Sequence, residues 1–192
     1  TTFAEEIRLR MDWGTNTERV DAVLSSVYCK GMTRLWDAVW IVSNEVFNGI
    51  DGKKAIIIMS DGLDNNSYYT YKDAMRAVIQ SNAAVYVVSK VEALRQINSF
   101  YYNSIPQREL SVADSVLRSL AYETGGRVLY PNSFGQLDDI YKQVNEELRN
   151  QYTLGYISTN TAKDGTYRHI SVGVAVENGS VSARPGYYAE TR

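Results

Sequence analysis

The residues best suited to bind a ligand directly follow an apolar segment. Residues 55–59 are Ala-Ile-Ile-Ile-Met, and Ser60, Asp61 and Gly62 come next. An unbroken apolar run of this length is typical of a strand that is buried on both faces of a parallel sheet. Asp61 then lies at the carboxyl end of a strand, where open α/β sheets bind their ligands. Magnesium accepts carboxylate oxygens together with several waters, so Asp61 is a candidate ligand of a divalent cation.

Thr33 is the second candidate ligand of that cation. It stands at the predicted start of a helix whose apolar stripe comprises Leu35, Val39, Val42 and Val46. As the N-cap residue, Thr33 can accept hydrogen bonds from helix N–H groups, or it can offer its hydroxyl to the ion. Asp61 also has a second interpretation, because it can begin a turn with Gly62. The residues alone leave both alternatives open at each position.

Three more polar residues are candidates to hydrogen-bond to the ligands of the ion, namely Ser60, Asp64 and Asp37. Asp64 is alternatively a solvated loop carboxylate. Asp37 lies one helical turn after Thr33 and is alternatively a structural hydrogen-bonding residue.

Tyrosines are abundant, at 15 copies, and several are clustered. A tyrosine offers a large apolar body with a polar tip, which suits a binding surface. Tyr68 and Tyr69, together with Tyr101 and Tyr102 in the long segment 91–110, are therefore candidates for a partner-binding rim. The alternative is packing within strands, because tyrosine has a high β-propensity.

Composition excludes several classes of function. The 192 residues carry 20 Lys+Arg and 22 Asp+Glu, so the net charge is −2, and no basic cluster predicts nucleic-acid binding. One cysteine and one histidine argue against a zinc cluster and against most Ser-His-Asp sites. The phosphate-binding glycine motifs and the G-x-S-x-G motif are absent from the sequence. No apolar run reaches the ~18 residues that predict a membrane span. We therefore do not expect an enzyme, a nucleic-acid partner or a membrane span in this chain.

Periodicity and capping residues predict an α/β fold. Helices are expected to begin near residues 15, 33, 70, 111 and 133, and buried strands at 55–59, 84–88 and 127–130. This alternation is typical of a doubly wound, mostly parallel sheet flanked by helices. In the tail, alternation over 170–176, the pair Asn178-Gly179 and a return over 181–184 predict a hairpin. With 152–157, these residues make an antiparallel extension over 152–192, packed on an α/β domain over 1–151.

Five strings, in order, resemble von Willebrand factor type A (vWA) domains. GMTRLWDAV and IIIMSDGLDN resemble the second and third metal-site segments of that family, and LRSLAYETGGRVLYPNS, EELRNQYTLGY and RPGYYA resemble its bacterial "VWFA-related" branch. The resemblance covers residues 3–189. It implies a Rossmann-like vWA fold and a site for Mg²⁺, or Mn²⁺ or Ca²⁺, in which Thr33 and Asp61 are metal ligands. It also implies a protein partner whose Asp or Glu completes the coordination, and an exported protein in the periplasm or at the cell surface.

One segment of the family pattern is absent. The first metal segment, Asp-x-Ser-x-Ser, occurs nowhere in the chain, and Thr1-Thr2-Phe3-Ala4 resembles the end of the family's second strand. We therefore expect that a strand, a helix and part of another strand, roughly forty residues, are missing upstream, and that the cation site depends on them. The leading hypothesis is a cation-dependent module for adhesion or assembly. The alternative is a structural or assembly domain with a degenerate metal site that binds through its Tyr-rich loops; a metal-assisted hydrolase is the least favoured.

Overall fold

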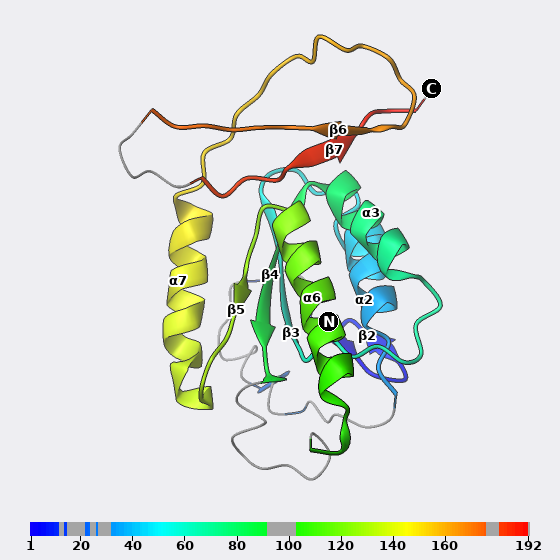
Figure 1. The fold of residues 1–192 in the computed structure, drawn as a ribbon, viewed down its shortest axis with the longest axis vertical. Coiled ribbons are helices and arrows are strands. Elements are labelled where there is room, and N and C mark those ends of the chain that lie inside the picture. The colour runs from blue at the N-terminus through cyan, green and yellow to red at the C-terminus, as the bar shows by residue number, and fades with distance from the viewer. Residues whose placement is uncertain are drawn as a thin grey trace. The chain divides into compact units, whose positions relative to one another are not determined.

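The computed structural model describes residues 1–11, 14, 22–23, 26, 32–91, 103–175 and 181–191. Figure 1 shows the elements of this part of the chain. The chain divides into two compact units. The first unit comprises Thr1–Gly52 and Leu63–Ser81, and the second comprises Lys53–Gly62 and Asn82–Arg192. The predicted boundary at residue 151 stays a prediction.

The second unit contains a parallel sheet of three strands in the order β3-β4-β5. These are β3 (Lys54–Ser60), β4 (Ala83–Ser89) and β5 (Val128–Leu129). The predicted parallel sheet and its first two strands are confirmed, since β3 and β4 pair along their whole length, from Lys54↔Ala83 to Ser60↔Ser89. The strand order follows the chain without a reversal. The doubly wound arrangement, which needs a reversal and places a ligand crevice there, is therefore not formed by the described strands.

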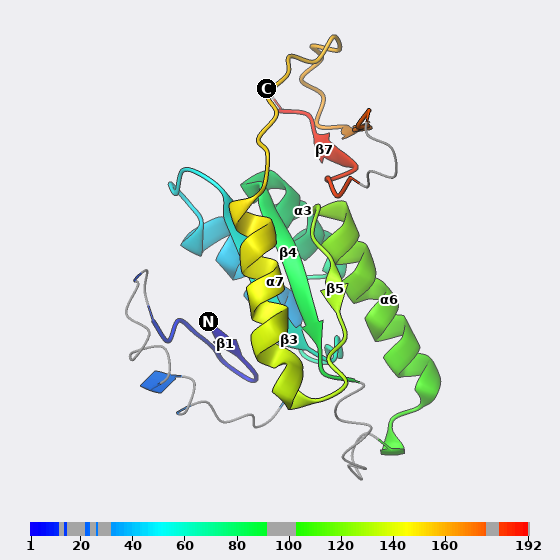
Figure 2. The ribbon, with the colours of Figure 1, turned by 90° about the vertical axis from the view of Figure 1, so that its left-hand side faces the viewer.

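Two helices cover opposite faces of this sheet, as Figure 2 shows: α6 (Gln107–Glu123) on one face and α7 (Leu137–Arg149), which follows the short turn η2 (Phe134–Gln136), on the other. On the α7 face, one buried cluster is made by Tyr86, Val88, Leu129, Ile140 and Val144. The neighbouring residues of β4, Val85 and Val87, point to the α6 face, because side chains alternate along a strand.

The start of α6 was predicted four residues too late. Pro106 is the N-cap residue, with an extended backbone, and the helix begins at Gln107. Ser111, expected at the cap, donates its hydroxyl to the Gln107 carbonyl inside the helix at 2.9 Å. The predicted end is confirmed, since Gly125 has φ +80°, which glycine adopts without strain.

The tail contains a short antiparallel pair, β6 (Tyr167–His169) with β7 (Gly186–Tyr188). Residues 152–157 are not a strand, and Tyr152 and Ile157 are 93% and 95% exposed. The expected strand over 170–176 is likewise not formed in its described part, 170–175. The alternating pattern in both segments lacks a ladder partner, which a strand requires.

The pairing register of the tail also differs from the expected one. A regular two-residue turn at Asn178-Gly179 would pair Tyr167 with Glu190, whereas Tyr167 pairs with Tyr188. The difference is two residues, so each side chain keeps its face of the pair. The turn itself lies outside the described residues.

The first unit contains the pair β1 (Thr2–Phe3) and β2 (Ile7–Arg8), helix α2 (Leu35–Ile41) with its π-helical continuation η1 (Val42–Val46), and helix α3 (Tyr71–Ser81).

The predicted cap of α3 is confirmed. The Thr70 N–H donates to Asp73 at 2.9 Å, and the Asp73 N–H donates to the Thr70 hydroxyl at 3.3 Å. The Thr70 hydroxyl also donates to the Asp73 carboxylate at 2.6 Å, and this bond together with the one from the Thr70 N–H holds the pKa of Asp73 below its ordinary value. The helix predicted over 15–27 lies largely outside the described residues.

Candidate binding site at the start of helix α2

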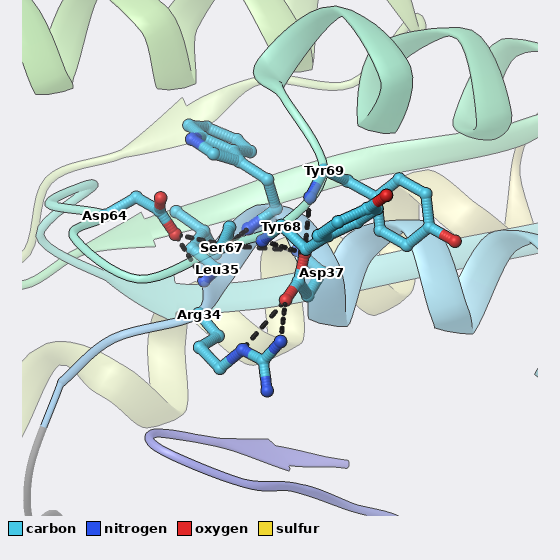
Figure 3. Close-up of polar contacts among 8 residues, drawn as sticks. Arg34, Leu35, Asp37, Asp64, Ser67, Tyr68 and Tyr69 are labelled. Carbon is cyan, nitrogen blue, oxygen red and sulfur yellow. Dashed lines mark hydrogen bonds and ion pairs between the residues drawn. The ribbon is translucent and has the colours of Figure 1, made fainter.

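The loop of residues 64–69 folds over the first turn of α2 (Figure 3). Asp64 accepts the Leu35 N–H at 2.7 Å, and the Ser67 hydroxyl oxygen accepts the N–H groups of Trp36 and Asp37 at 3.1 and 3.2 Å. The Ser67 hydroxyl in turn donates to Asp64 at 2.6 Å. The N–H groups that every helix leaves unpaired at its start are thus satisfied by side chains about thirty residues later in the chain.

Thr33 is not the N-cap of this helix, so that prediction is wrong. Arg34 is the N-cap residue, and no side chain of its own segment caps the helix. Thr33 is instead held by its backbone. Its N–H donates to the Asn65 side-chain oxygen at 2.7 Å, and its carbonyl accepts the N–H groups of Asn65 and Asn66 at 3.2 and 3.1 Å. The Thr33 hydroxyl takes part in none of these bonds.

Asp37 ties the loop to the helix through both carboxylate oxygens. The residue is only 3% exposed. Its Oδ1 accepts the N–H groups of Tyr68 and Tyr69, each at 2.8 Å, and its Oδ2 accepts Nε and Nη2 of Arg34 at 2.8 and 2.7 Å. Charge-assisted bonds of this kind are roughly twice as strong as neutral ones. The backbone of Tyr68 and Tyr69 is therefore fixed relative to α2.

Three aromatic side chains gather where this loop meets the helix. Tyr69 stacks on Trp40 with ring centroids 4.1 Å apart and an interplanar angle of 10°. Tyr68 meets Tyr69 edge to face at 5.4 Å and is itself 83% exposed. We call Trp40, Tyr68 and Tyr69 the aromatic corner. Tyr101 and Tyr102, the other members of the predicted rim, lie outside the described residues.

Asp61 follows β3 directly, in the second unit, and is partly exposed. Ser60 before it is buried, and its hydroxyl oxygen accepts the Gly62 N–H at 3.1 Å. Gly62 has φ +81°, and a Cβ on it would lie 2.7 Å from Leu117 and 2.9 Å from the Ala113 carbonyl. Only glycine fits there, so the turn after Asp61 is fixed closely against α6.

The side-chain oxygens of the predicted metal ligands and their supporting residues fit a cation site only in part. Asp37 and Asp64, two of the predicted supporting residues, already accept backbone N–H groups. Among the described residues, no group of three or more His, Cys, Asp or Glu side chains is placed to hold a metal ion. The remaining predicted ligands are the Thr33 hydroxyl, in the first unit, and the Asp61 carboxylate, in the second. Both are oxygen donors that magnesium takes together with water.

Ser67, Asn65 and Arg34 were not among the residues predicted for the site. The run Asp64-Asn65-Asn66-Ser67 consists of residues that readily cap and turn. That composition was a usable signal for a capping loop. It could not name the helix being capped, because a cap provided by a distant segment has no characteristic spacing.

Comparisons with known proteins place the chain in no family. No family model matches it, and no curated protein matches it. One similar solved structure is described as an uncharacterized membrane spanning protein from Vibrio fischeri. It is 15% identical, with a TM-score of 0.36, over 75% of this chain and 72% of that one, a similarity too low to support an argument. In the described part of this chain, no helix is long and apolar enough to cross a membrane.

Proposed function

We propose that this chain is a protein-binding module and that the aromatic corner of Trp40, Tyr68 and Tyr69 is its contact surface. One observation carries the proposal: the buried carboxylate of Asp37 accepts the N–H groups of both Tyr68 and Tyr69. Of the three rings, Tyr68 is exposed and Trp40 and Tyr69 are partly exposed, and a fixed backbone lowers the conformational entropy lost when a partner binds. Tyrosine and tryptophan side chains are also enriched among the residues that dominate binding energy at protein interfaces.

The vWA resemblance supports the same class of function, since vWA domains bind proteins. We propose that the chain is related to that family and that β3, β4 and β5 form one half of a doubly wound sheet. The ordered strings between residues 3 and 189 and the parallel sheet support this relationship. The same resemblance supports our proposal that the protein is exported to the periplasm or the cell surface.

A selection from a random-peptide phage library on the wild-type protein tests the aromatic corner. We expect Tyr68→Ala to raise the dissociation constant of the selected peptides about tenfold or more, as truncation of an interface hot spot does. The matched control is Tyr122→Ala, which removes another exposed tyrosine, on α6. If the selected peptides bind both variants as tightly as the wild type, the aromatic corner is not the contact surface.

A second candidate function is cation-dependent adhesion. Two observations favour it: Asp61 directly follows β3, and the Thr33 hydroxyl does not cap α2. Thr33 and Asp61 would hold the ion, Mg²⁺ or Mn²⁺, and the ion would supply an open coordination position for a carboxylate of the partner. Within the chain, the close packing of Gly62 on α6 fixes the backbone that carries Asp61.

A further inference from the structure

Two tyrosines of the tail meet through their hydroxyl groups. Tyr156 lies in the segment that follows α7, and Tyr187 lies in β7, opposite Arg168 of β6. Their ring centroids are 6.4 Å apart at an interplanar angle of 77°, and the Tyr156 hydroxyl donates a hydrogen bond to the Tyr187 hydroxyl. In each ring, Cε is bonded directly to the carbon that bears the hydroxyl, so this contact also brings the Cε carbons of the two rings near each other.

The surroundings of Tyr187 favour the loss of its hydroxyl proton. Ser158 and Tyr156 both donate hydrogen bonds to that hydroxyl. These two bonds, and then the positive charges of Arg168 and Arg184, lower the pKa of Tyr187. Nε and Nη1 of Arg168 are buried, and a buried charge is screened less than an exposed one. A phenol that ionises readily also gives up an electron readily, because the phenolate is the more easily oxidised form.

We propose that Tyr156 and Tyr187 become joined as a dityrosine when the protein meets hydrogen peroxide and a haem peroxidase. Each phenol loses one electron and its hydroxyl proton, which leaves a radical that is shared with the ring carbons beside the hydroxyl. A Cε–Cε bond then pairs the two unpaired electrons, and the hydrogen on each joined carbon moves to the oxygen and restores the phenol. The two electrons and two protons that were lost reduce one hydrogen peroxide to two waters.

Tyrosine rings that lie closer together are less suited to this coupling. The centroids of Tyr167 and Tyr188 are 5.2 Å apart, but the Tyr167 hydroxyl donates to Glu123. Partial burial and that bond raise the pKa of Tyr167 to about 12, so its phenol keeps its proton and resists oxidation. The ring of Tyr69 is held in its stack on Trp40.

The segment that carries Tyr156 can make the approach that the new bond needs. Residues 152–157 are not a strand, and Tyr156 is 60% exposed, whereas Tyr187 is held in the β6–β7 pair. The two residues are about thirty positions apart, so the bond constrains the unfolded chain as a disulfide does. With one cysteine, these 192 residues cannot form a disulfide among themselves. This cross-link goes beyond the proposed function and does not involve the aromatic corner.

Peptide mapping of the oxidised protein tests the cross-link. Trypsin leaves Tyr156 on the peptide 150–163 and Tyr187 on the peptide 169–192. The dilute protein is treated briefly with a haem peroxidase and hydrogen peroxide, and the monomer is isolated, so that links between molecules are removed. We expect the two peptides to be joined, with the mass of their sum less two hydrogens and with the fluorescence of dityrosine.

Each peptide carries a second tyrosine, Tyr152 or Tyr188, so substitutions decide which rings couple. Tyr156→Phe and Tyr187→Phe should each abolish the joined peptides. Tyr152→Phe is the matched control, because it removes a tyrosine of the same segment that is 93% exposed; it should retain the joined peptides, as should Tyr188→Phe. A wild type without joined peptides, or joined peptides that persist in Tyr156→Phe or in Tyr187→Phe, would overturn the proposal.

Discussion

Asp37 is the residue on which the geometry of the aromatic corner depends. Its carboxylate is buried, yet every partner it needs is in place: two backbone N–H groups on one oxygen and the Arg34 guanidinium on the other. A buried charge is tolerated when it is paired and hydrogen-bonded in this way. The same arrangement makes the residue costly to lose, because its partners are then left without an acceptor.

We expect Asp37→Ala to lower the free energy of unfolding by about 2–3 kcal/mol, since it leaves two N–H groups and a partly buried guanidinium unpaired. Urea unfolding followed by circular dichroism measures the change. Asp51→Ala, at an exposed loop carboxylate, is the control and should stay within about 0.5 kcal/mol of the wild type. A loss below about 1 kcal/mol for Asp37→Ala would contradict the role assigned to this carboxylate.

At the scale of elements, two substitutions decide whether Ser67 or Thr33 caps the start of α2. The structure predicts that Ser67→Ala costs about 1–2 kcal/mol, because the Trp36 and Asp37 N–H groups lose their acceptor. Thr33→Ala, measured in EDTA by the same urea unfolding, should change stability by less than about 0.5 kcal/mol. The reverse order of the two effects would restore Thr33 as the cap.

The sequence predicts an element when the interactions that form it lie within that element. The strands β3 and β4 and the Thr70–Asp73 cap were predictable, because their apolar runs and capping residues lie within the element. The cap of α2 was not, because its donors and acceptors are about thirty residues apart. Residues 152–157 have the pattern of a strand without forming one, because alternation describes a face and supplies no partner strand. Of the candidate site, the sequence therefore predicted Asp37, Asp64, Tyr68 and Tyr69, but neither Ser67 and Trp40 nor the hydrogen bonds that join the loop to the helix.

The tail is joined to α6 by a hydrogen bond from the Tyr167 hydroxyl of β6 to Glu123 at 2.8 Å. Partial burial and this bond to Glu123 raise the pKa of Tyr167 from 10.0 to about 12. The folded protein thus holds the phenol proton more tightly than the unfolded chain does. The contribution of this bond to stability is complete below pH 10 and is lost as the pH rises toward 12.

We therefore expect Tyr167→Phe to destabilise the protein by about 1 kcal/mol at pH 8, the usual net value of one hydrogen bond. The difference between the two proteins should shrink between pH 10 and about 12, where the wild-type phenol ionises. Urea unfolding of both proteins across this pH range measures it. Tyr122→Phe, on the exposed surface of α6, controls for loss of a hydroxyl. A difference that stays constant with pH would show that the bond to Glu123 does not raise the pKa of Tyr167.

At the scale of the whole molecule, the two candidate functions differ in what they predict for thermal stability. Only cation-dependent adhesion predicts that a divalent cation stabilises the folded chain. An ion that binds only the folded chain stabilises it by about 2.7 kcal/mol at a hundredfold excess over its dissociation constant. For a chain of this size, that corresponds to a rise of about 5–10 °C in the unfolding midpoint.

If Thr33 and Asp61 hold the ion, Mg²⁺ or Mn²⁺ should raise the midpoint relative to EDTA. Asp61→Ala should abolish the rise, and Thr33→Ala should reduce it. Asp51→Ala should retain it in full, because that carboxylate lies in an exposed loop and is not a predicted ligand. Peptide binding by the aromatic corner, measured on the same samples, should be indifferent to EDTA. A midpoint that does not move with either cation would show that Thr33 and Asp61 hold no ion in this chain. Peptide binding by the aromatic corner should then persist, since Asp37 accepts the N–H groups of Tyr68 and Tyr69 without an ion.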